Sequence, residues 1–290
     1  MDSFFTHSIW YITLAAVGAI MLIVIFIKAP QPRKKTFAFW FAVLGFTYCL
    51  EVSLLLLFNA YTYYPMIVPD DPFFDAVLGN IFSQVSVSSS AVLICVLGLS
   101  VWWLAGFSVG YFLIDILFVS LGIYEHYWYR SIFSLAGFFI YGLITKYWYE
   151  RIFSGTSQKW IDYPTLFLSV FAVSANLIGT LVKALDLRTF QSAFYSDSSR
   201  NHTATALIYT PVMIMIMMAL LKWHSPWWQK TIIFVLLLIC QWGLIESGVM
   251  AVKPGWEIAV MLFDLAVFYF GTVLMDGCLR SEAKPRLSSV

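Results

Sequence analysis

Long runs of apolar residues recur along the whole chain, and they constrain its fold more than any other feature. A run of about 20 such residues is long enough for a helix to cross the hydrocarbon core of a bilayer. We predict spans near 8–28, 37–59, 76–104, 107–125, 131–148, 164–186, 204–222, 231–252 and 256–278. Only the residues AGFS separate the third run from the fourth. The expected fold is all-α, a polytopic transmembrane helix bundle of about nine spans in one integral membrane domain, 1–290, with a short cytoplasmic tail at 279–290.

The composition excludes an ordinary soluble protein. Hydrophobic residues make up 61% of the 290 residues and charged residues only 11%, whereas a soluble domain has about 25% charged residues. The net charge of +1, without a basic arm, gives no indication of nucleic-acid binding. The four cysteines form no CxxC pair, which argues against a disulfide framework or a zinc site. We expect no metal and no cofactor, and we expect the lipid bilayer as a partner.

The triplet Tyr-Trp-Tyr occurs on both sides of the predicted span 131–148, at 127–129 and at 147–149. A helix rises about 1.5 Å per residue, so the two triplets would lie about 30 Å apart. That distance equals the thickness of the hydrocarbon core, and Trp and Tyr concentrate at both of its interfaces. We therefore predict that Trp128 and Trp148 lie at opposite membrane interfaces.

The distribution of Lys and Arg predicts the orientation. With the N-terminus outside, 12 of the 17 basic residues fall on the cytoplasmic side and five on the external side. The positive-inside rule therefore favours an external N-terminus and a cytoplasmic C-terminus. The longest external loop, 187–203, then contains Arg188 and the triplet Asn-His-Thr at 201–203, which fits a glycosylation acceptor.

Four acidic residues fall inside predicted spans: Glu51, Asp115, Glu246 and Asp264. A charged side chain at the centre of a bilayer costs about 2.5–3.5 kcal/mol on insertion scales. On the predicted orientation these acids lie between the midplane and the outer leaflet, where no basic residue is expected at comparable depth. Either they line an outward-facing cavity for a cation, a proton or a polar solute, or they are neutral and hydrogen-bond between helices.

The third predicted span is unusually polar, with the sequence GNIFSQVSVSSSAV at 79–92. Its small hydroxyl residues allow helices to approach closely and to bond across the interface, so we expect this helix at the centre of the bundle. Packing is the favoured role of this helix, and it is compatible with a site. Asn80 and Gln84 therefore join the acids as candidates for an intramembrane polar or ion site.

A second group, Glu125, His126 and Arg130, is expected at the outer interface, where it is typical of a charge cluster and not of a metal site. The segment GFSVG at 106–110 matches G-x-S-x-G, but a nucleophile elbow needs a strand before its serine. Here the motif lies between membrane spans and also fits the close-packing pattern G-x-x-x-G. We expect no catalytic residue, and the sequence argues against an enzyme because no catalytic set converges.

From about 32 to 153 the order of features resembles a family of small multi-pass membrane proteins of endospore-forming Gram-positive bacteria. The matching segments are DPFFDAVLGNIFSQ at 71–84, LGIYEHYWYR at 121–130 and KYWYERIF at 146–153. The resemblance implies a bacterial plasma membrane. It supplies no mechanism, because we know of no established activity for that family, and it does not extend to the helices after residue 160.

Two classes of function remain open. The favoured one is binding or transport of a small solute, ion or proton through an outward-facing acidic cavity. The alternative is a non-catalytic sensor or structural component whose acids only pack helices and which binds a partner membrane protein. The parity of the spans permits a duplication of the second to fifth helices as the sixth to ninth, although no matching residues indicate one.

Overall fold

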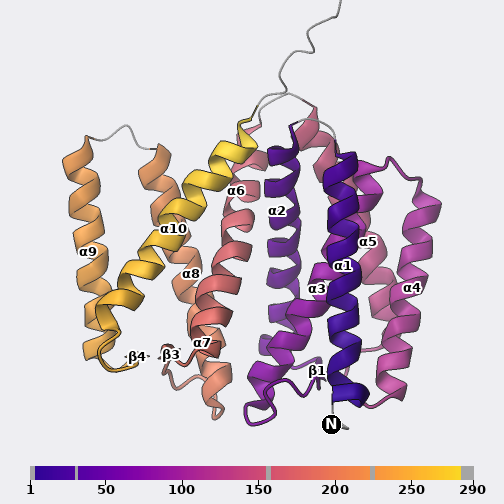
Figure 1. The fold of residues 1–290 in the computed structure, drawn as a ribbon, viewed down its shortest axis with the longest axis horizontal. Helices are drawn as coiled ribbons and strands as arrows, with labels where there is room; N and C mark the ends of the chain where they lie inside the picture. The colour runs from indigo at the N-terminus through magenta and orange to yellow at the C-terminus, as the bar shows by residue number, and fades with distance from the viewer. Residues whose placement is uncertain (1–3, 30–31, 155–157, 223–225, 282–290) are drawn as a thin grey trace, which may run out of the picture.

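The computed structural model describes residues 4–29, 32–154, 158–222 and 226–281 (Figure 1). Within these residues eight helices are long and apolar enough to cross a membrane, so the chain is a multi-pass membrane protein with an all-α fold. A ninth helix, α5 (Ser131–Phe153), is 23 residues long but is not among those eight. Most of the predicted tail, from 282 onward, lies outside the described residues.

The chain begins with a π-helical turn, η1 (Phe4–Ser8), that continues into α1 (Ile9–Lys28). The next elements are α2 (Arg33–Val52), η2 (Ser53–Leu57), β1 (Tyr61–Tyr63), α3 (Pro72–Val96), α4 (Val101–Ser120), β2 (Tyr124–His126) and α5 (Ser131–Phe153). The remainder comprises α6 (Lys159–Ser174), η3 (Ala175–Leu181), α7 (Val182–Ala184), β3 (Arg188–Phe190), α8 (Ser198–Lys222), α9 (Trp227–Glu246), β4 (Met250–Val252) and α10 (Glu257–Leu279).

The elements after α1 form two units with the same order. The first unit runs from α2 to α5 and the second from α6 to α10. Helices α3 and α8 both contain 25 residues, α4 and α9 both contain 20, and α5 and α10 both contain 23. Each helix of the second unit begins 126 residues after its counterpart, as Ser198 does after Pro72. The first helix of each unit ends in a π-helical turn, η2 or η3.

The short strands carry the same repeat at the level of single hydrogen bonds. In each unit the strand after the first helix pairs antiparallel with the strand after the third, β1 with β2 and β3 with β4. The amide of Tyr64 donates to the Ile123 carbonyl at 2.9 Å, and that of Gln191 donates to the Val249 carbonyl at 2.8 Å. One extra residue before β3 makes the offset 127 at this strand, as the paired positions 64 and 191 show. The chain therefore contains an internal structural duplication, which no matching residues in the sequence indicated.

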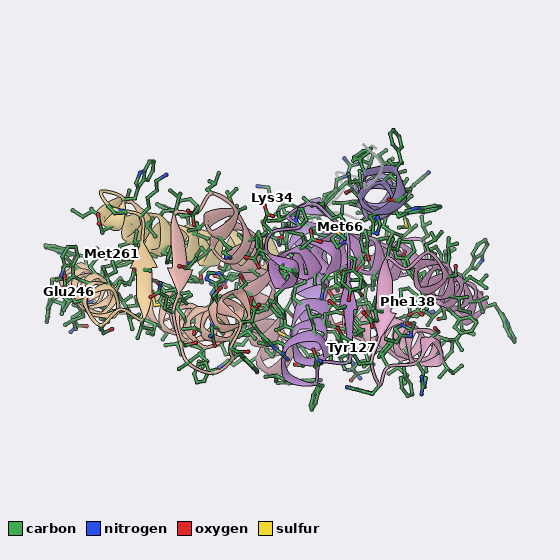
Figure 2. The ribbon with its side chains drawn as sticks, turned by 90° about the horizontal axis from the view of Figure 1, so that it is seen from below. Lys34, Met66, Tyr127, Phe138, Glu246 and Met261 are labelled. Atoms are coloured by element: carbon green, nitrogen blue, oxygen red, sulfur yellow. The ribbon has the colours of Figure 1, made fainter. Side chains whose placement is uncertain are left out.

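Both strand pairs lie at the same end of the bundle, at the bottom of Figure 1, which we call the strand end. The N-terminal end of η1 also lies there, and α10 ends at the opposite end. Viewed from the strand end, the two strand pairs are well separated, one within each unit (Figure 2). The two units therefore run in the same direction.

Close backbone contacts join the units and attach α1. A Cβ atom added to Gly45 of α2 would lie 2.1 Å from the carbonyl oxygen of Leu168 in α6, so α2 and α6 pack backbone to backbone. A Cβ on Gly18 of α1 would lie 2.8 Å from the amide nitrogen of Ser86 in α3. The serine-rich helix α3 is thus held between α1 and the rest of the first unit, as expected for a central helix.

Several predicted boundaries are corrected. The break between the third and fourth spans lies between Val96 and Val101 and not at AGFS, because Gly98 has a φ of +62° and ends the helix. The predicted spans 107–125 and 231–252 extend past the C-terminal ends of α4 and α9, since their last residues form β2 and β4. Apolar residues at and just before these strands, Ile123 and Tyr124 in one unit and Val249 and Met250 in the other, extend the apolar runs of the preceding helices, so hydropathy alone does not separate them.

The two aromatic triplets flank α5 at opposite ends, with Trp128 before the helix and Trp148 in its last turns. Trp128 is 49% exposed. Trp148 is partly buried, and its indole donates to the Thr165 hydroxyl at 2.9 Å and packs edge-on against Phe39. The triplet at 147–149 therefore contributes to packing between helices as well as to the surface.

Candidate functional site

The largest described cavity lies inside the first unit, among α2, α3, α4 and α5, and we call it the unit cavity. Its volume is about 570 Å³, within the range of small-molecule sites. Ten aromatic side chains line it: Phe58, Tyr63, Tyr111, Phe118, Tyr124, Trp128, Tyr129, Phe133, Phe138 and Tyr141. The remaining wall includes the two acids Glu51 and Asp115 together with small polar residues. Among the lining residues that the structure describes there is no Lys or Arg.

Glu51 enters the unit cavity from the end of α2, just before the π-helical turn η2. Its Oε2 accepts a short hydrogen bond from the Tyr61 hydroxyl and lies 3.4 Å from Nδ2 of Asn80. A π-helical turn adds a residue to a helix and is frequent at functional sites. All the hydrogen-bond donors that the structure gives Glu51 are uncharged, so no described cation balances this carboxylate.

Asp115 enters the same cavity from the C-terminal third of α4 and is 93% buried. Its Oδ2 accepts from the Ser134 hydroxyl at 2.5 Å. Nε2 of His126 lies 3.4 Å from Oδ1, but neither of these two buried atoms has a hydrogen bond in the described part of the chain. One oxygen of Asp115 is therefore buried at the cavity wall without a hydrogen-bond donor, an arrangement that costs stability unless a ligand satisfies it.

The polar part of the wall is supplied mainly by α3. Gln84 and Ser83 line the unit cavity, and Gln84 is buried. Deeper along α3, Ser86 and Ser90 both lie 2.8 Å from the Tyr111 hydroxyl. These hydrogen bonds fix the Tyr111 ring against the wall.

The strand pair β1–β2 covers the cavity at the strand end. Tyr63 and Tyr124 face each other across the pair and stack with their centroids 4.6 Å apart. Burial, with a further contribution from the Glu51 carboxylate, raises the pKa of Tyr61 well above its ordinary value. Burial also raises the pKa of Tyr124 well above its ordinary value, and the neighbouring phenols of Tyr63 and Tyr61 raise it further. Both phenols therefore remain protonated, and Tyr61 is a permanent donor to Glu51.

The side of the cavity between α2 and α5 has an apolar, exposed rim. Leu50 and Phe133, both 45% exposed, and Phe58, 61% exposed, contribute to this rim. The indole of Trp128 donates to the Phe58 carbonyl at 2.8 Å and so ties the segment after β2 to the end of α2. At the other end of the unit the Tyr141 hydroxyl donates to the Val43 carbonyl at 3.2 Å, which joins α5 to α2 beneath the cavity.

The second unit holds a buried ion pair between β3 and α10. Arg188 of β3 pairs with Asp264 of α10, and both side chains are 0% exposed. The guanidinium also donates to the Ile178 carbonyl at 3.1 Å, and its carbon lies 4.7 Å from the Phe190 ring centre and 5.9 Å from that of Tyr209. The expectation that no basic residue would reach the depth of the acids is wrong for Asp264. The pairing of β3 with β4 directs Arg188 into the unit, although the sequence predicted it in an external loop.

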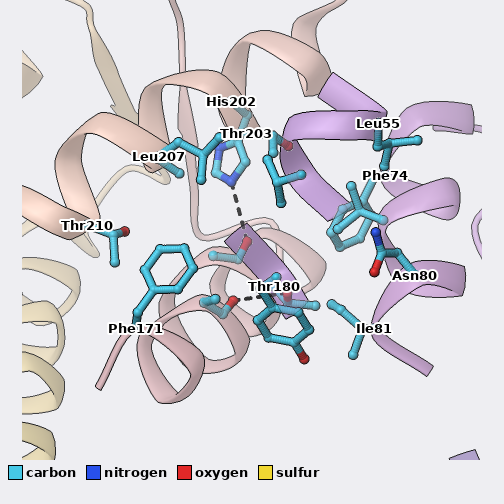
Figure 3. A pocket seen from close by; sticks show the side chains of 16 residues that line it. Leu55, Phe74, Asn80, Ile81, Phe171, Thr180, His202, Thr203, Leu207 and Thr210 are labelled. Atoms are coloured by element: carbon cyan, nitrogen blue, oxygen red, sulfur yellow. Dashed lines mark hydrogen bonds between the residues drawn. The ribbon is translucent and has the colours of Figure 1, made fainter. Parts of the chain in front are cut away.

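A smaller cavity lies between the units, and we call it the interface cavity (Figure 3). Its volume is about 90 Å³, and its wall combines α2 and α3 with α6, η3 and α8. His202 reaches it from α8, with Nδ1 accepting from the Phe190 amide at 3.0 Å and Nε2 3.4 Å from the Gly179 carbonyl. Asn80 also lines it, and its Oδ1 is buried without a hydrogen bond in the described chain. Since Asn80 also contacts Glu51, it lies in the wall between the two cavities.

The structure brings together four of the six candidate intramembrane residues. Glu51, Asp115 and Gln84 line the unit cavity, and Asn80 contacts Glu51. Asp264 belongs to the second unit and is paired there. Glu246 is exposed at the end of α9, at the far side of the molecule from the cavity residue Phe138 (Figure 2).

The expected outer cluster does not form. Successive residues of a strand point to opposite faces, so Glu125 and His126 of β2 separate. Glu125 accepts from the Tyr64 hydroxyl at 2.5 Å, whereas His126 turns toward Asp115. Arg130 precedes α5 and is exposed.

Two further sequence motifs have structural roles. Asn201, in the predicted glycosylation triplet, is buried in α8, and both of its side-chain groups bond to the backbone of Tyr195. Ser108 is buried in α4, where its hydroxyl donates to the Leu104 carbonyl. Neither side chain has the exposed setting that its motif would require.

Sequence reasoning missed Tyr61, Ser134 and Arg188, which contact Glu51, Asp115 and Asp264, respectively. Tyr61 and Arg188 lie in loops between spans, where hydropathy indicates only a connection. A period-2 pattern of buried residues at 61–63 and 188–190 is the local signal that they share, but three residues are too few to predict a strand. A comparison with protein families, curated proteins and solved structures found no match to this chain.

Proposed function

We propose that this membrane protein binds a small cation, a proton or a polar solute in the unit cavity and moves it across the membrane. One observation carries the proposal: the buried carboxylate of Asp115 and the partly buried carboxylate of Glu51 line one cavity whose described wall contains no Lys or Arg. Buried charges in membrane proteins are costly and typically mark ion or substrate pathways. A structural duplication of parallel units is also typical of transporter folds.

We further propose that the strand end faces the outside of a bacterial plasma membrane, so that the unit cavity lies in the outer half. The positive-inside rule supports this orientation, and the resemblance over 32–153 supports the bacterial membrane. That stretch coincides with the first unit, α2 to α5. Single cysteines at Asp70 and Lys34 of a cysteine-free variant test the orientation, because both positions are exposed and lie at opposite ends. An impermeant reagent added to intact cells should label only position 70, and labelling of position 34 would reverse the orientation.

Charge movement in proteoliposomes tests the transport step. The purified full-length protein is exposed to concentration jumps of Na⁺, K⁺, ammonium and n-propylguanidinium, and to pH jumps, while the transient current is recorded. We expect a current with at least one of these cations. The variants Glu51→Gln and Asp115→Asn should lose it, because each amide keeps the shape of the acid and removes its charge.

Glu246→Gln is the matched control, since Glu246 is an exposed acid outside the cavity. Its current should equal that of the unmodified chain. Absence of current with every cation tested, or an equal current in both cavity variants, would count against transport through this site.

A second candidate function, a structural or sensor component, is favoured by one set of contacts. Each acid accepts a hydrogen bond from another element, Glu51 from Tyr61 and Asp115 from Ser134. If the acids serve only packing, Glu51→Gln and Asp115→Asn should be tolerated and should change no current. The alanine variants of the same residues should then lose about 1–3 kcal/mol of unfolding free energy, because a buried partner loses its acceptor.

A further inference from the structure

The second unit contains a buried binding site for a guanidinium ion, occupied by its own Arg188. A carboxylate oxygen of Asp264, a carbonyl oxygen of Ile178 and the rings of Phe190 and Tyr209 surround the charged group. Carboxylates and carbonyl oxygens accept the guanidinium N–H groups, and ring faces attract the delocalised cation.

The same positions in the first unit form the wall of the unit cavity. With the offset of 126 residues for α3/α8 and α5/α10, and 127 at β1/β3, the counterparts of Asp264, Tyr209 and Phe190 are Phe138, Ser83 and Tyr63. All three counterparts line the cavity. The counterpart of Arg188 is Tyr61, whose hydroxyl ends at Glu51. The unit cavity therefore occupies the place that the Arg188 side chain fills in the second unit.

The charges of the first unit are complementary to a cation that the unit does not supply. The acid has moved from α10 in the second unit to α2 in the first, where Glu51 has only uncharged hydrogen-bond donors in the described chain. Asp115 adds a second carboxylate with a buried oxygen that has no hydrogen bond. His126 is the one described titratable base beside Asp115, and it balances that charge only when it is protonated.

We propose that the unit cavity binds an organic monocation, an alkylguanidinium or an alkyl- or arylammonium ion. Its charged head lies between Glu51 and Asp115, and its apolar part lies along the aromatic wall toward the rim formed by Leu50 and Phe133. A volume of about 570 Å³ accommodates a head group together with an apolar substituent. This assignment rests on the proposed function and names the class of solute.

Binding of n-propylguanidinium and of its neutral isostere n-propylurea to the full-length protein in lipid nanodiscs tests the assignment by calorimetry. The two probes have nearly the same shape and differ in charge. We expect n-propylguanidinium to bind at least tenfold more tightly than n-propylurea. Glu51→Gln and Asp115→Asn should each weaken its binding at least tenfold, and Glu246→Gln should leave it unchanged.

Equal binding of the two probes, or unchanged binding in both cavity variants, would overturn the assignment. If neither acid variant folds, Ser83→Trp provides a second test, because it fills the cavity from α3 without removing an acid; retained binding would again overturn the assignment. Currents that depend on Glu51 and Asp115 with Na⁺ or protons, without binding of n-propylguanidinium or phenethylammonium, would leave transport standing and refute the organic cation. Binding of these probes without any current would leave the organic-cation site standing and refute transport.

Discussion

The two units share their helix lengths, their π-helical turns and their strand pairing, yet they hold different groups at their centres. The second unit encloses an ion pair between Arg188 and Asp264, and the first surrounds a cavity with Glu51 and Asp115 on its wall. The framework is set by backbone features that recur at equivalent positions. The polar content is set by a few side chains: the charge of Asp264 is paired with Arg188 inside the second unit, whereas the described wall of the unit cavity contains no Lys or Arg.

The same substitution in the two units should produce the largest contrast. Asp264→Asn leaves the Arg188 guanidinium buried without its carboxylate, and breaking such a pair costs about 3–5 kcal/mol. Asp115→Asn removes an acid that has no Lys or Arg partner in the described wall, so we expect a loss below about 1 kcal/mol. Unfolding by SDS in mixed micelles measures both values. Equal losses of unfolding free energy would show that Asp115 depends on a charged partner as much as Asp264 does.

An arginine introduced into the first unit at the position equivalent to Arg188 should fill the unit cavity. Tyr61→Arg places a guanidinium at the position equivalent to Arg188 and beside Glu51. Binding of n-propylguanidinium should fall at least tenfold, which corresponds to about 1.4 kcal/mol. Tyr64→Arg is the control, because Tyr64 is near β1 but its hydroxyl bonds to the exposed Glu125. Equal binding by both variants would contradict the equivalence of the two sites.

Shared backbone features should respond equally in the two units. Gly122 and Gly248 have φ values of +70° and +75°, and a Cβ atom at either position would meet no atom within 4 Å. Alanine at each position therefore adds only backbone strain, of about 1 kcal/mol. Unfolding of Gly122→Ala and Gly248→Ala should give the same loss, and a clear difference would weaken the structural duplication. Gly106→Ala, at an open helical position, controls for the substitution itself.

The contact between the units at the strand end should have the smallest effect and a defined pH dependence. Oδ2 of Asp71 accepts from Ser199 and lies 3.0 Å from Nζ of Lys183, and both partners belong to the second unit. Burial alone would raise the pKa of Asp71, but the hydrogen bonds from Ser199 and Lys183 outweigh it and lower the pKa below its ordinary value. Its contribution is therefore present above the unfolded-state pKa of about 3.9 and is lost as the pH falls through the lower folded-state pKa.

Asp71→Asn should thus cost about 0.5 kcal/mol at neutral pH, because the pair is partly exposed to solvent. Near pH 3 the difference from the unmodified chain should shrink. Asp197, the counterpart of Asp71, bonds to the Arg200 amide at the start of α8, and asparagine serves that cap equally well. Asp197→Asn should therefore be neutral at every pH. Unfolding at pH 7 and pH 3 measures both variants, and a larger loss for Asp71→Asn at pH 3 would reverse the assigned sign.

The sequence by itself determined that the chain is helical and lies in a membrane, because hydropathy and the deficit of charge depend only on local composition. It also identified Glu51, Asp115, Gln84 and Asn80 as candidates, since polar residues in apolar runs are visible without a fold. Tertiary structure decided which acids share a cavity and which has a partner, because Arg188 reaches Asp264 across 76 residues of chain. The duplication was also hidden from the sequence, since lipid-facing positions accept many apolar residues, whereas helix lengths and strand pairing are fixed by backbone hydrogen bonds that every residue except proline can form.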